Sequence, residues 1–261
     1  MEKTFETEGP IEAEVRVPAG VIEVQASDAN TAAVLLEPVR ASRGAHELLA
    51  DTEVSLVGGT LRVHVPDRTL RNVDIRCSLR LPGGSALATR TASADVAVSM
   101  ALRAFEGTTA SGDVTLGDVA QDVSHRSASG DFKCGTVGGR LHVRTASGDV
   151  AVRRASGRVE LALASGDAHV EDAEGSVGVR SASGDVRLDC VRRGRVHAAT
   201  ASGDVTVGVA AGVAAHLDVT TVSGDTGCML PFDEHAGASD PALEIVARTV
   251  SGDVVVRGAG R

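Results

Sequence analysis

Residues 141–152 read LHVRTASGDVAV, and this alternation on both sides of a Ser-Gly-Asp corner recurs along most of the chain. The corner, or a variant differing in one letter, occurs nine times, with its serine at Ser93, Ser111, Ser129, Ser147, Ser165, Ser183, Ser202, Ser223 and Ser251. The first six serines are 18 residues apart, and the later gaps are 19, 21 and 28 residues. A fixed period indicates one small unit stacked on copies of itself, because so short a unit cannot bury an apolar face alone.

Apolar residues hold a constant phase within the repeat. They are Val123, Leu141, Val159, Val177 and Val196 before the corner, and Val114, Phe132, Val150, Val186 and Val205 after it. Alternation with a period of two places these side chains on one inward face of two strands. We therefore predict an all-β protein, a single-stranded parallel β-solenoid (β-helix) with about 18 residues per coil. An antiparallel meander with Ser-Gly hairpin turns is the alternative, but it leaves one apolar face uncovered.

The quality of the repeat divides the chain into two regions. Residues 1–81 carry faded copies, such as GVIEVQASD at 20–28, and are expected to form a divergent N-terminal β cap region with one helical turn at 45–51. Residues 82–261 form the regular solenoid. A loop insertion is expected at 226–243, where Pro231 and Pro241 lie in an expanded repeat.

Charge and composition exclude some functions. The net charge is −9, and without the nine corner aspartates 26 acidic residues would face 26 basic ones. An acidic chain with four phenylalanines as its only aromatic residues is not expected to bind nucleic acid. The scarcity of lysine beside arginine indicates a GC-rich bacterial genome, and the absence of a leader or a long apolar run predicts a cytoplasmic protein with no membrane span.

The Ser-Gly-Asp-Val corners at Asp113, Asp131, Asp149, Asp185, Asp204 and Asp253, which follow an N-terminal β region, resemble the DUF4097 family of β-strand repeat proteins. That family is related to proteins labelled putative adhesins. The resemblance implies a right-handed β-helix-like fold without an established enzymatic activity. It also implies a link, in some relatives, to bacterial envelope stress.

The aspartate column is the first candidate site. A structural interpretation is favoured, in which each carboxylate beside a glycine accepts hydrogen bonds from turn amides. The alternative is a weak divalent-cation ladder of hard oxygen ligands, formed by Asp113, Asp131, Asp149, Asp167, Asp185 and Asp204. No cofactor is expected.

Two candidate interaction surfaces follow from the repeat. Arginine recurs three places before the serine and forms a surface stripe that includes Arg126, Arg144 and Arg180, together with Arg90 and Arg248. The second surface is Val254, Val255 and Val256, which we expect to form an open C-terminal edge that invites strand pairing.

The remaining reactive residues indicate no catalytic site. The four cysteines are expected to be buried, inert thiols, and the scattered histidines to be solvated on the surface. The leading hypothesis is a non-catalytic scaffold for protein interaction or self-assembly, as an end-to-end dimer or filament. An adhesin-like module that binds glycans or divalent cations is the alternative, and a polysaccharide-acting enzyme comes third. A small-molecule ligand is not expected.

Overall fold

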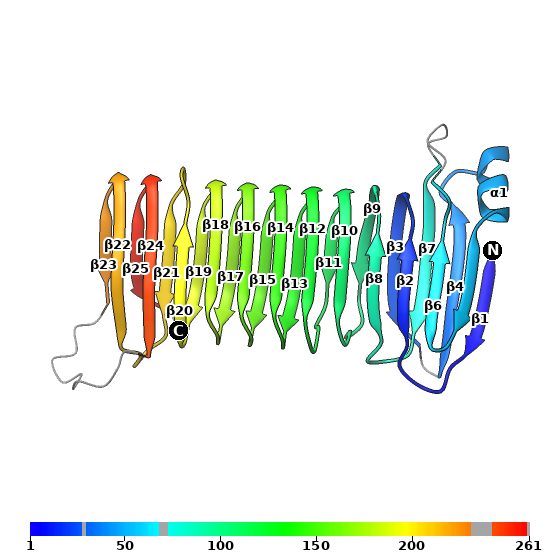
Figure 1. Ribbon diagram of the computed structural model, residues 1–261, viewed down its shortest axis with the longest axis horizontal. Helices are drawn as coiled ribbons and strands as arrows, with labels where there is room; N and C mark the ends of the chain where they lie inside the picture. The colour runs from blue at the N-terminus through cyan, green and yellow to red at the C-terminus, as the bar shows by residue number, and fades with distance from the viewer. Residues whose placement is uncertain (28–29, 68–72, 231–241, 260–261) are drawn as a thin grey trace. The chain divides into compact units, whose positions relative to one another are not determined.

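The computed structural model describes residues 1–27, 30–67, 73–230 and 242–259. It divides into two compact units, Met1–Cys134 and Gly135–Arg261, and both consist almost entirely of β-strands (Figure 1). The change from faded to regular repeats at residues 81–82 falls inside the first unit, and a domain boundary there stays a prediction.

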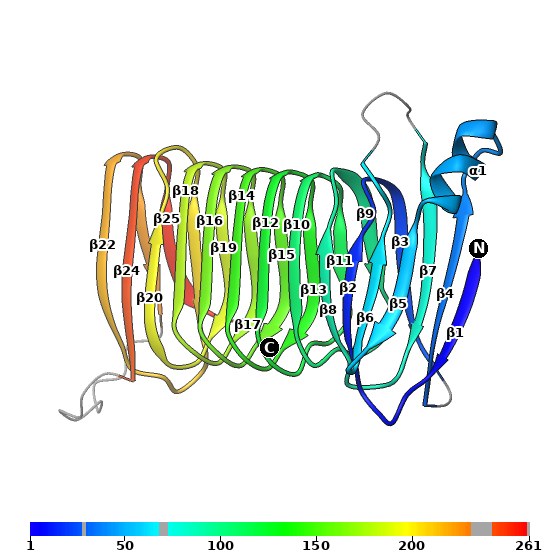
Figure 2. The same cartoon turned by 45° about the vertical axis from the view of Figure 1, so that its right-hand side comes forward.

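The second unit is a stack of two-stranded coils. In each coil a strand of one sheet leads through a corner into a strand of the other sheet (Figure 2). The strands are β14 (Leu141–Ser147), β15 (Val150–Ala155), β16 (Val159–Ser165), β17 (Ala168–Ala173), β18 (Val177–Ser183), β19 (Val186–Val191), β20 (Gly194–Ala199), β21 (Val205–Val209), β22 (Ala215–Ser223), β23 (Thr226–Met229), β24 (Leu243–Ser251) and β25 (Val254–Gly258).

Pairing between coils is parallel and keeps the sequence repeat in register. Leu141 of β14 lies opposite Val159 of β16, and Val150 of β15 lies opposite Ala168 of β17. Partners are thus one period apart, as the solenoid prediction requires, and the antiparallel meander is wrong. The predicted inward positions are buried, with Val159 at 0% and Val177 at 1% exposure. A buried valine stabilises the fold by roughly 1.5 to 3 kcal/mol, so most of the stability comes from these columns.

The last coils of the second unit are stacked out of chain order. The sheets run β21-β25-β23 and β20-β24-β22, so the coil β24–β25 lies between its two predecessors (Figure 1, red between yellow and orange). The prediction that Val254–Val256 form an open edge is therefore wrong, because β25 pairs with β21 on one side and with β23 on the other. The open coil is β22–β23.

The expected loop at 226–243 also needs correction. Its first four residues form β23, which pairs in parallel with β25, and Leu243 already begins β24. Residues 231–241, including Pro231 and Pro241, lie outside the described residues.

The first unit combines coils with antiparallel strands. Its elements are β1 (Glu2–Glu6), β2 (Glu12–Arg16), β3 (Ala19–Ala26), β4 (Thr31–Pro38), α1 (Arg43–Ala50), β5 (Glu53–Val57), β6 (Thr60–His64), β7 (Ile75–Leu81), β8 (Ala86–Arg90), β9 (Ser93–Val98), β10 (Phe105–Ser111), β11 (Val114–Leu116), β12 (Val123–Ser129) and β13, which begins at Phe132 and ends at Val137. The sheet orders are β1-β4-β7-β3-β9-β11-β13 and β5-β6-β2-β8-β10-β12. The coil β2–β3 is thus inserted between β6–β7 and β8–β9 (Figure 2).

The expected helical turn is α1. Ser42 caps its N-terminus, because the Ser42 hydroxyl accepts a hydrogen bond from the Ala45 amide at 3.1 Å. Ala45, Leu48 and Leu49 are buried on one face, and the helix contacts β4. Within the described residues, no helix has the length and apolarity needed to cross a bilayer.

The corner brings successive backbones too close together for a side chain. Gly166 has φ +119°, and a Cβ atom on it would lie 2.3 Å from the Gly148 carbonyl oxygen of the preceding coil. Glycine is therefore required at this position by both the backbone conformation and the stacking distance.

We predict that Gly166→Ala lowers the free energy of unfolding by about 2 to 6 kcal/mol, because strain at φ and overpacking each cost about 1 to 3 kcal/mol. Gly178→Ala is the matched control, since a Cβ there meets its nearest atom at 3.8 Å. Urea denaturation of both variants measures the difference. Equal stability of the two variants would contradict the requirement for glycine at the corner.

Candidate functional site

Each corner aspartate forms a hydrogen bond to the neighbouring coil. The Asp167 amide donates to Asp149 Oδ1 at 2.8 Å, and the Asp185 amide donates to Asp167 Oδ1 at the same distance. In the first unit the Asp113 amide donates to the carboxylate of Asp95 at 3.0 Å. The carboxylate is an acceptor, as the structural interpretation expects, but its donor is the amide of the next coil rather than of its own turn.

These hydrogen bonds follow the spatial order of the coils. The Asp253 amide donates to Asp204 Oδ1 at 2.8 Å. The Asp225 amide donates to Asp253 Oδ1 at the same distance, although Asp225 precedes Asp253 in the chain. The carboxylate thus serves the stacking of coils. The part of the chain that the structure describes contains no group of three or more His, Cys, Asp or Glu residues that could hold a metal ion.

The arginine stripe is sparse in the second unit. Arg144 lies opposite Ala162, and Arg180 lies between Ala162 and Ala199 on the neighbouring strands. Arg248 forms an ion pair with Asp218 at 3.2 Å. Arg180 is therefore an exposed single charge, and an interaction role for Arg144 and Arg180 stays a prediction.

In the first unit the outward row at this level contains more charged side chains. Across β6, β2, β8, β10 and β12, the register aligns side chains that point outward at one level: His64, Arg16, Arg90, Thr108 and Arg126. The row one level away along the strands contains Arg62, Glu14, Ala88 and Glu106. Strand pairing thus gathers charges from segments that are up to about 110 residues apart in the chain.

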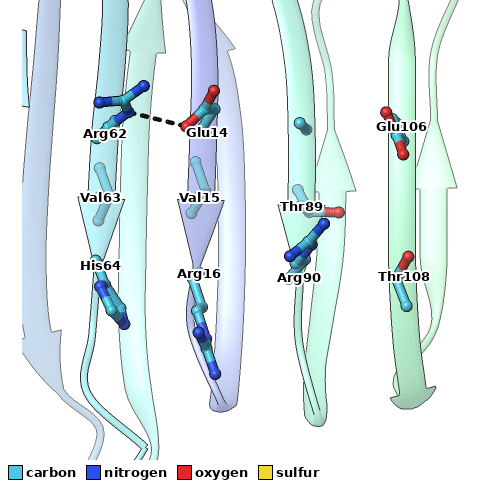
Figure 3. A pocket seen from close by; sticks show the side chains of 11 residues that line it. Glu14, Val15, Arg16, Arg62, Val63, His64, Thr89, Arg90, Glu106 and Thr108 are labelled. Atoms are coloured by element: carbon cyan, nitrogen blue, oxygen red, sulfur yellow. Dashed lines mark hydrogen bonds and ion pairs between the residues drawn. The ribbon is translucent and has the colours of Figure 1, made fainter.

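The members of these two rows on β6, β2, β8 and β10 line a groove of about 410 Å³ on the outer face of those strands (Figure 3). Arg62 donates to Glu14 Oε2 at 3.0 Å, which is the interaction drawn in the figure. Arg16 and Arg90 have no acidic partner among the described residues. The groove can therefore receive an anionic group.

Sequence reasoning identified Arg90 but missed the other residues of this groove. Arg62 and His64 lie in an alternating segment, and Arg16 ends another, so their outward phase was readable. Their position beside Arg90 was not readable, because it depends on the insertion of β2 between β6 and β8.

Other charged clusters are ion-pair networks. Asp172, with a side chain 14% exposed, contacts Arg154 at 3.2 Å and Arg192 at 2.9 Å. Partial burial of Asp189 favours a higher pKa, but hydrogen bonds with His169 and Arg187 hold that pKa below its usual value. The carboxylates in both networks are thus charged partners of arginines.

The cysteines differ in exposure. Burial raises the pKa of the Cys77 and Cys134 thiols to about 12, which makes them inert. Cys190 is half-buried, and Cys228 is exposed. The expectation of four buried thiols is therefore wrong for Cys228, because its strand β23 belongs to the open coil.

His125 is not a surface histidine, which corrects the expectation for this residue. It is 1% exposed, and its ring stacks on Phe132 with centroids 5.0 Å apart. Neither ring nitrogen has a hydrogen-bond partner among the described residues. Burial lowers the pKa of His125 to about 4, so the ring is neutral near pH 7.

His125 makes the stability of the fold depend on pH. A histidine in the unfolded chain has a pKa of about 6.5, whereas the folded value is about 4. Between these values the unfolded chain binds more protons, so the free energy of unfolding decreases as the pH falls from about 6.5 to about 4, by at most about 3 kcal/mol. We predict that His125→Leu removes this part of the pH dependence in urea titrations, whereas the exposed-residue control His64→Gln retains it. A wild-type slope in His125→Leu would contradict the assignment.

The hydrogen bond between coils predicts that different substitutions of Asp149 lower the free energy of unfolding by different amounts. Asp149→Ala should lower the free energy of unfolding by about 1 to 2 kcal/mol, because the Asp167 amide loses its acceptor. Asp149→Asn keeps an acceptor oxygen and should cost less. Thermal melts with and without millimolar Ca²⁺ check the alternative: a large stabilisation of the wild type by Ca²⁺ that Asp149→Ala lacks would favour a cation ladder.

Comparisons with known proteins identify a family for this chain. No curated protein matches the chain. Similar solved structures are a putative adhesin from Bacteroides fragilis (10% identity, TM-score 0.38, 98% of this chain and 96% of that chain), a putative lipid binding protein from Parabacteroides distasonis (12%, 0.41, 97% and 96%) and a putative cell adhesion protein from Clostridium sporogenes (11%, 0.24, 99% and 99%). Similarity at this level transfers no ligand or partner. The family model described as Toastrack DUF4097 matches residues 42–257, and the chain therefore belongs to this family, which the Ser-Gly-Asp-Val corners predicted.

Proposed function

We propose that the protein is a non-catalytic scaffold that self-assembles through its open coil, β22–β23. The proposal rests on one observation. Apolar residues of this coil are partly exposed, whereas the residues at the same positions in the neighbouring coil face the core and are buried. Leu243, Ile245 and Ala247 of β24 are 0% exposed, whereas the positions opposite them in β22, including Leu217 and Val219, are only half-buried.

The open coil also has free backbone edges. Among the described residues, β22 pairs only with β24, and β23 pairs only with β25. Val222 is 77% exposed and Met229 is 69% exposed on these strands. An unpaired edge beside exposed apolar side chains favours pairing with another strand.

The edge strands of the first unit carry protection that β22 lacks. β1 reads EKTFE, and the Lys3 ammonium donates to the Val54 carbonyl of β5 at 2.9 Å. β22 is nine residues long and contains neither lysine nor proline, and its one acidic residue, Asp218, is paired with Arg248. Charged residues and short length discourage edge pairing, so β22 is the edge best suited to it.

A second copy of the chain is the proposed occupant. Two copies of one edge strand can pair about a two-fold axis, which is the commonest symmetry of homo-oligomers. Pairing would cover Leu217 and Val219 of both copies. The adhesin-like alternative and the polysaccharide-acting enzyme lack a comparable observation, and a cytoplasmic location and a role in envelope stress remain proposals.

Light scattering coupled to size exclusion, over a concentration series, tests the assembly. We expect the mass to rise from 26.5 kDa toward twice that value. Val219→Lys should raise the dissociation constant of the dimer at least tenfold, because it places a charge in the contact. Val255→Lys is the control, since β25 is paired on both sides and Val255 lies one coil inward.

A wild-type protein that stays at the monomer mass at the highest concentration would refute self-assembly. If Val219→Lys and Val255→Lys raise the dissociation constant of the dimer equally, the contact does not lie at β22. Circular dichroism melts confirm that each variant is folded before its mass is compared.

A further inference from the structure

The groove on β6, β2, β8 and β10 contains two arginines that the protein itself does not neutralise. Arg16 and Arg90 are directly opposite on adjacent parallel strands, which are about 4.8 Å apart. Both are exposed, and neither side chain has a hydrogen bond or an ion pair among the described residues. Two like charges at this spacing repel each other, so an anion bound between them would be stabilised by both.

Ala88 opens the space beside the two arginines. It lies between Glu14 and Glu106, which are its partners on the two neighbouring strands. The short side chain leaves a hollow with one carboxylate on each side. Glu14 is bonded to Arg62, whereas Glu106 has no partner among the described residues.

The two charged levels are two residues apart along each strand. Glu14 and Arg16 are separated in this way on β2, which corresponds to about 6.6 Å along an extended strand. A ligand that spans the hollow thus meets two cations at one end and two carboxylates at the other. The groove volume of about 410 Å³ lies within the range of about 300 to 1,000 Å³ of small-molecule sites.

We propose that this groove binds a small phosphate monoester that carries an ammonium group. The phosphate has a charge of about −1.5 to −2 at pH 7, which two arginines can neutralise through several charge-assisted hydrogen bonds. The ammonium group lies over Ala88, between Glu14 and Glu106. This ligand class differs from the expectation that small molecules are not bound, and the proposal is independent of self-assembly, which concerns the second unit.

Other anionic ligands fit the groove less well. A long polyanion would meet carboxylates at one level, and Thr108 interrupts the cationic row before Arg126. A neutral sugar would have no phenylalanine, tyrosine or tryptophan ring on which to stack, because none of these lines the groove. A ligand with both charges uses the two arginines, Arg16 and Arg90, and the two carboxylates, Glu14 and Glu106.

Isothermal titration with O-phosphoethanolamine at low ionic strength tests the proposal. We expect saturable binding to the wild type, and at least tenfold weaker binding to Arg16→Gln and Arg90→Gln. Arg180→Gln is the matched control, because Arg180 has the same outward position but lies between two alanines. It should bind like the wild type.

Titrations with inorganic phosphate and with ethanolamine test the phosphate half and the ammonium half of the site one at a time. Glu106→Gln should weaken binding of O-phosphoethanolamine several-fold and leave or improve binding of inorganic phosphate. Absence of saturable binding to the wild type, or equal loss in Arg180→Gln and Arg90→Gln, would overturn the proposal. Equal effects of Glu106→Gln on both probes would overturn the assignment of the ammonium group. Thermal melts establish that each exposed-residue variant is folded.

Discussion

The close contact between successive corners is the constraint on which both units depend. At most corners a glycine with positive φ lies against the backbone of a neighbouring coil, and an aspartate carboxylate accepts a hydrogen bond from the next coil. A shift of one residue between coils would place a Cβ atom against a carbonyl group and turn the apolar columns outward. The corner therefore sets the register of every strand that leaves it.

A fixed register has a direct effect on the surface. Because partners are always at the same phase, side chains that point outward form straight rows across the strands, and only these positions can change without disturbing the core. In the second unit the arginine row contains alanines, which leave Arg180 isolated. In the first unit the same geometry brings Arg16 next to Arg90. Binding differences within such a fold can thus arise from single outward residues.

Much of the architecture is readable from the sequence, since the period and the alternation specify parallel pairing, the inward columns and the corner. The burial of His125 was also readable, because it lies two residues after Val123, at the phase occupied by Val143 and Leu161. The stacking order was not readable, since the corner at Ser251 has the same residues whether its coil lies inside or at the end. The groove was missed for the same reason: β2 has no corner motif that reveals its neighbours.

The insertion of β24–β25 between earlier coils affects how the chain acquires its structure. During synthesis β22–β23 leaves the ribosome first and can stack directly on β20–β21, which presents the same kind of edge. The native order requires that this provisional contact be absent or be broken before the later coil enters. The pairing of β20 with β24 also joins segments that are far apart in the chain, which slows folding. Once formed, the inserted coil is held on both sides, so it resists fraying and cleavage by proteases more strongly than a coil at the edge.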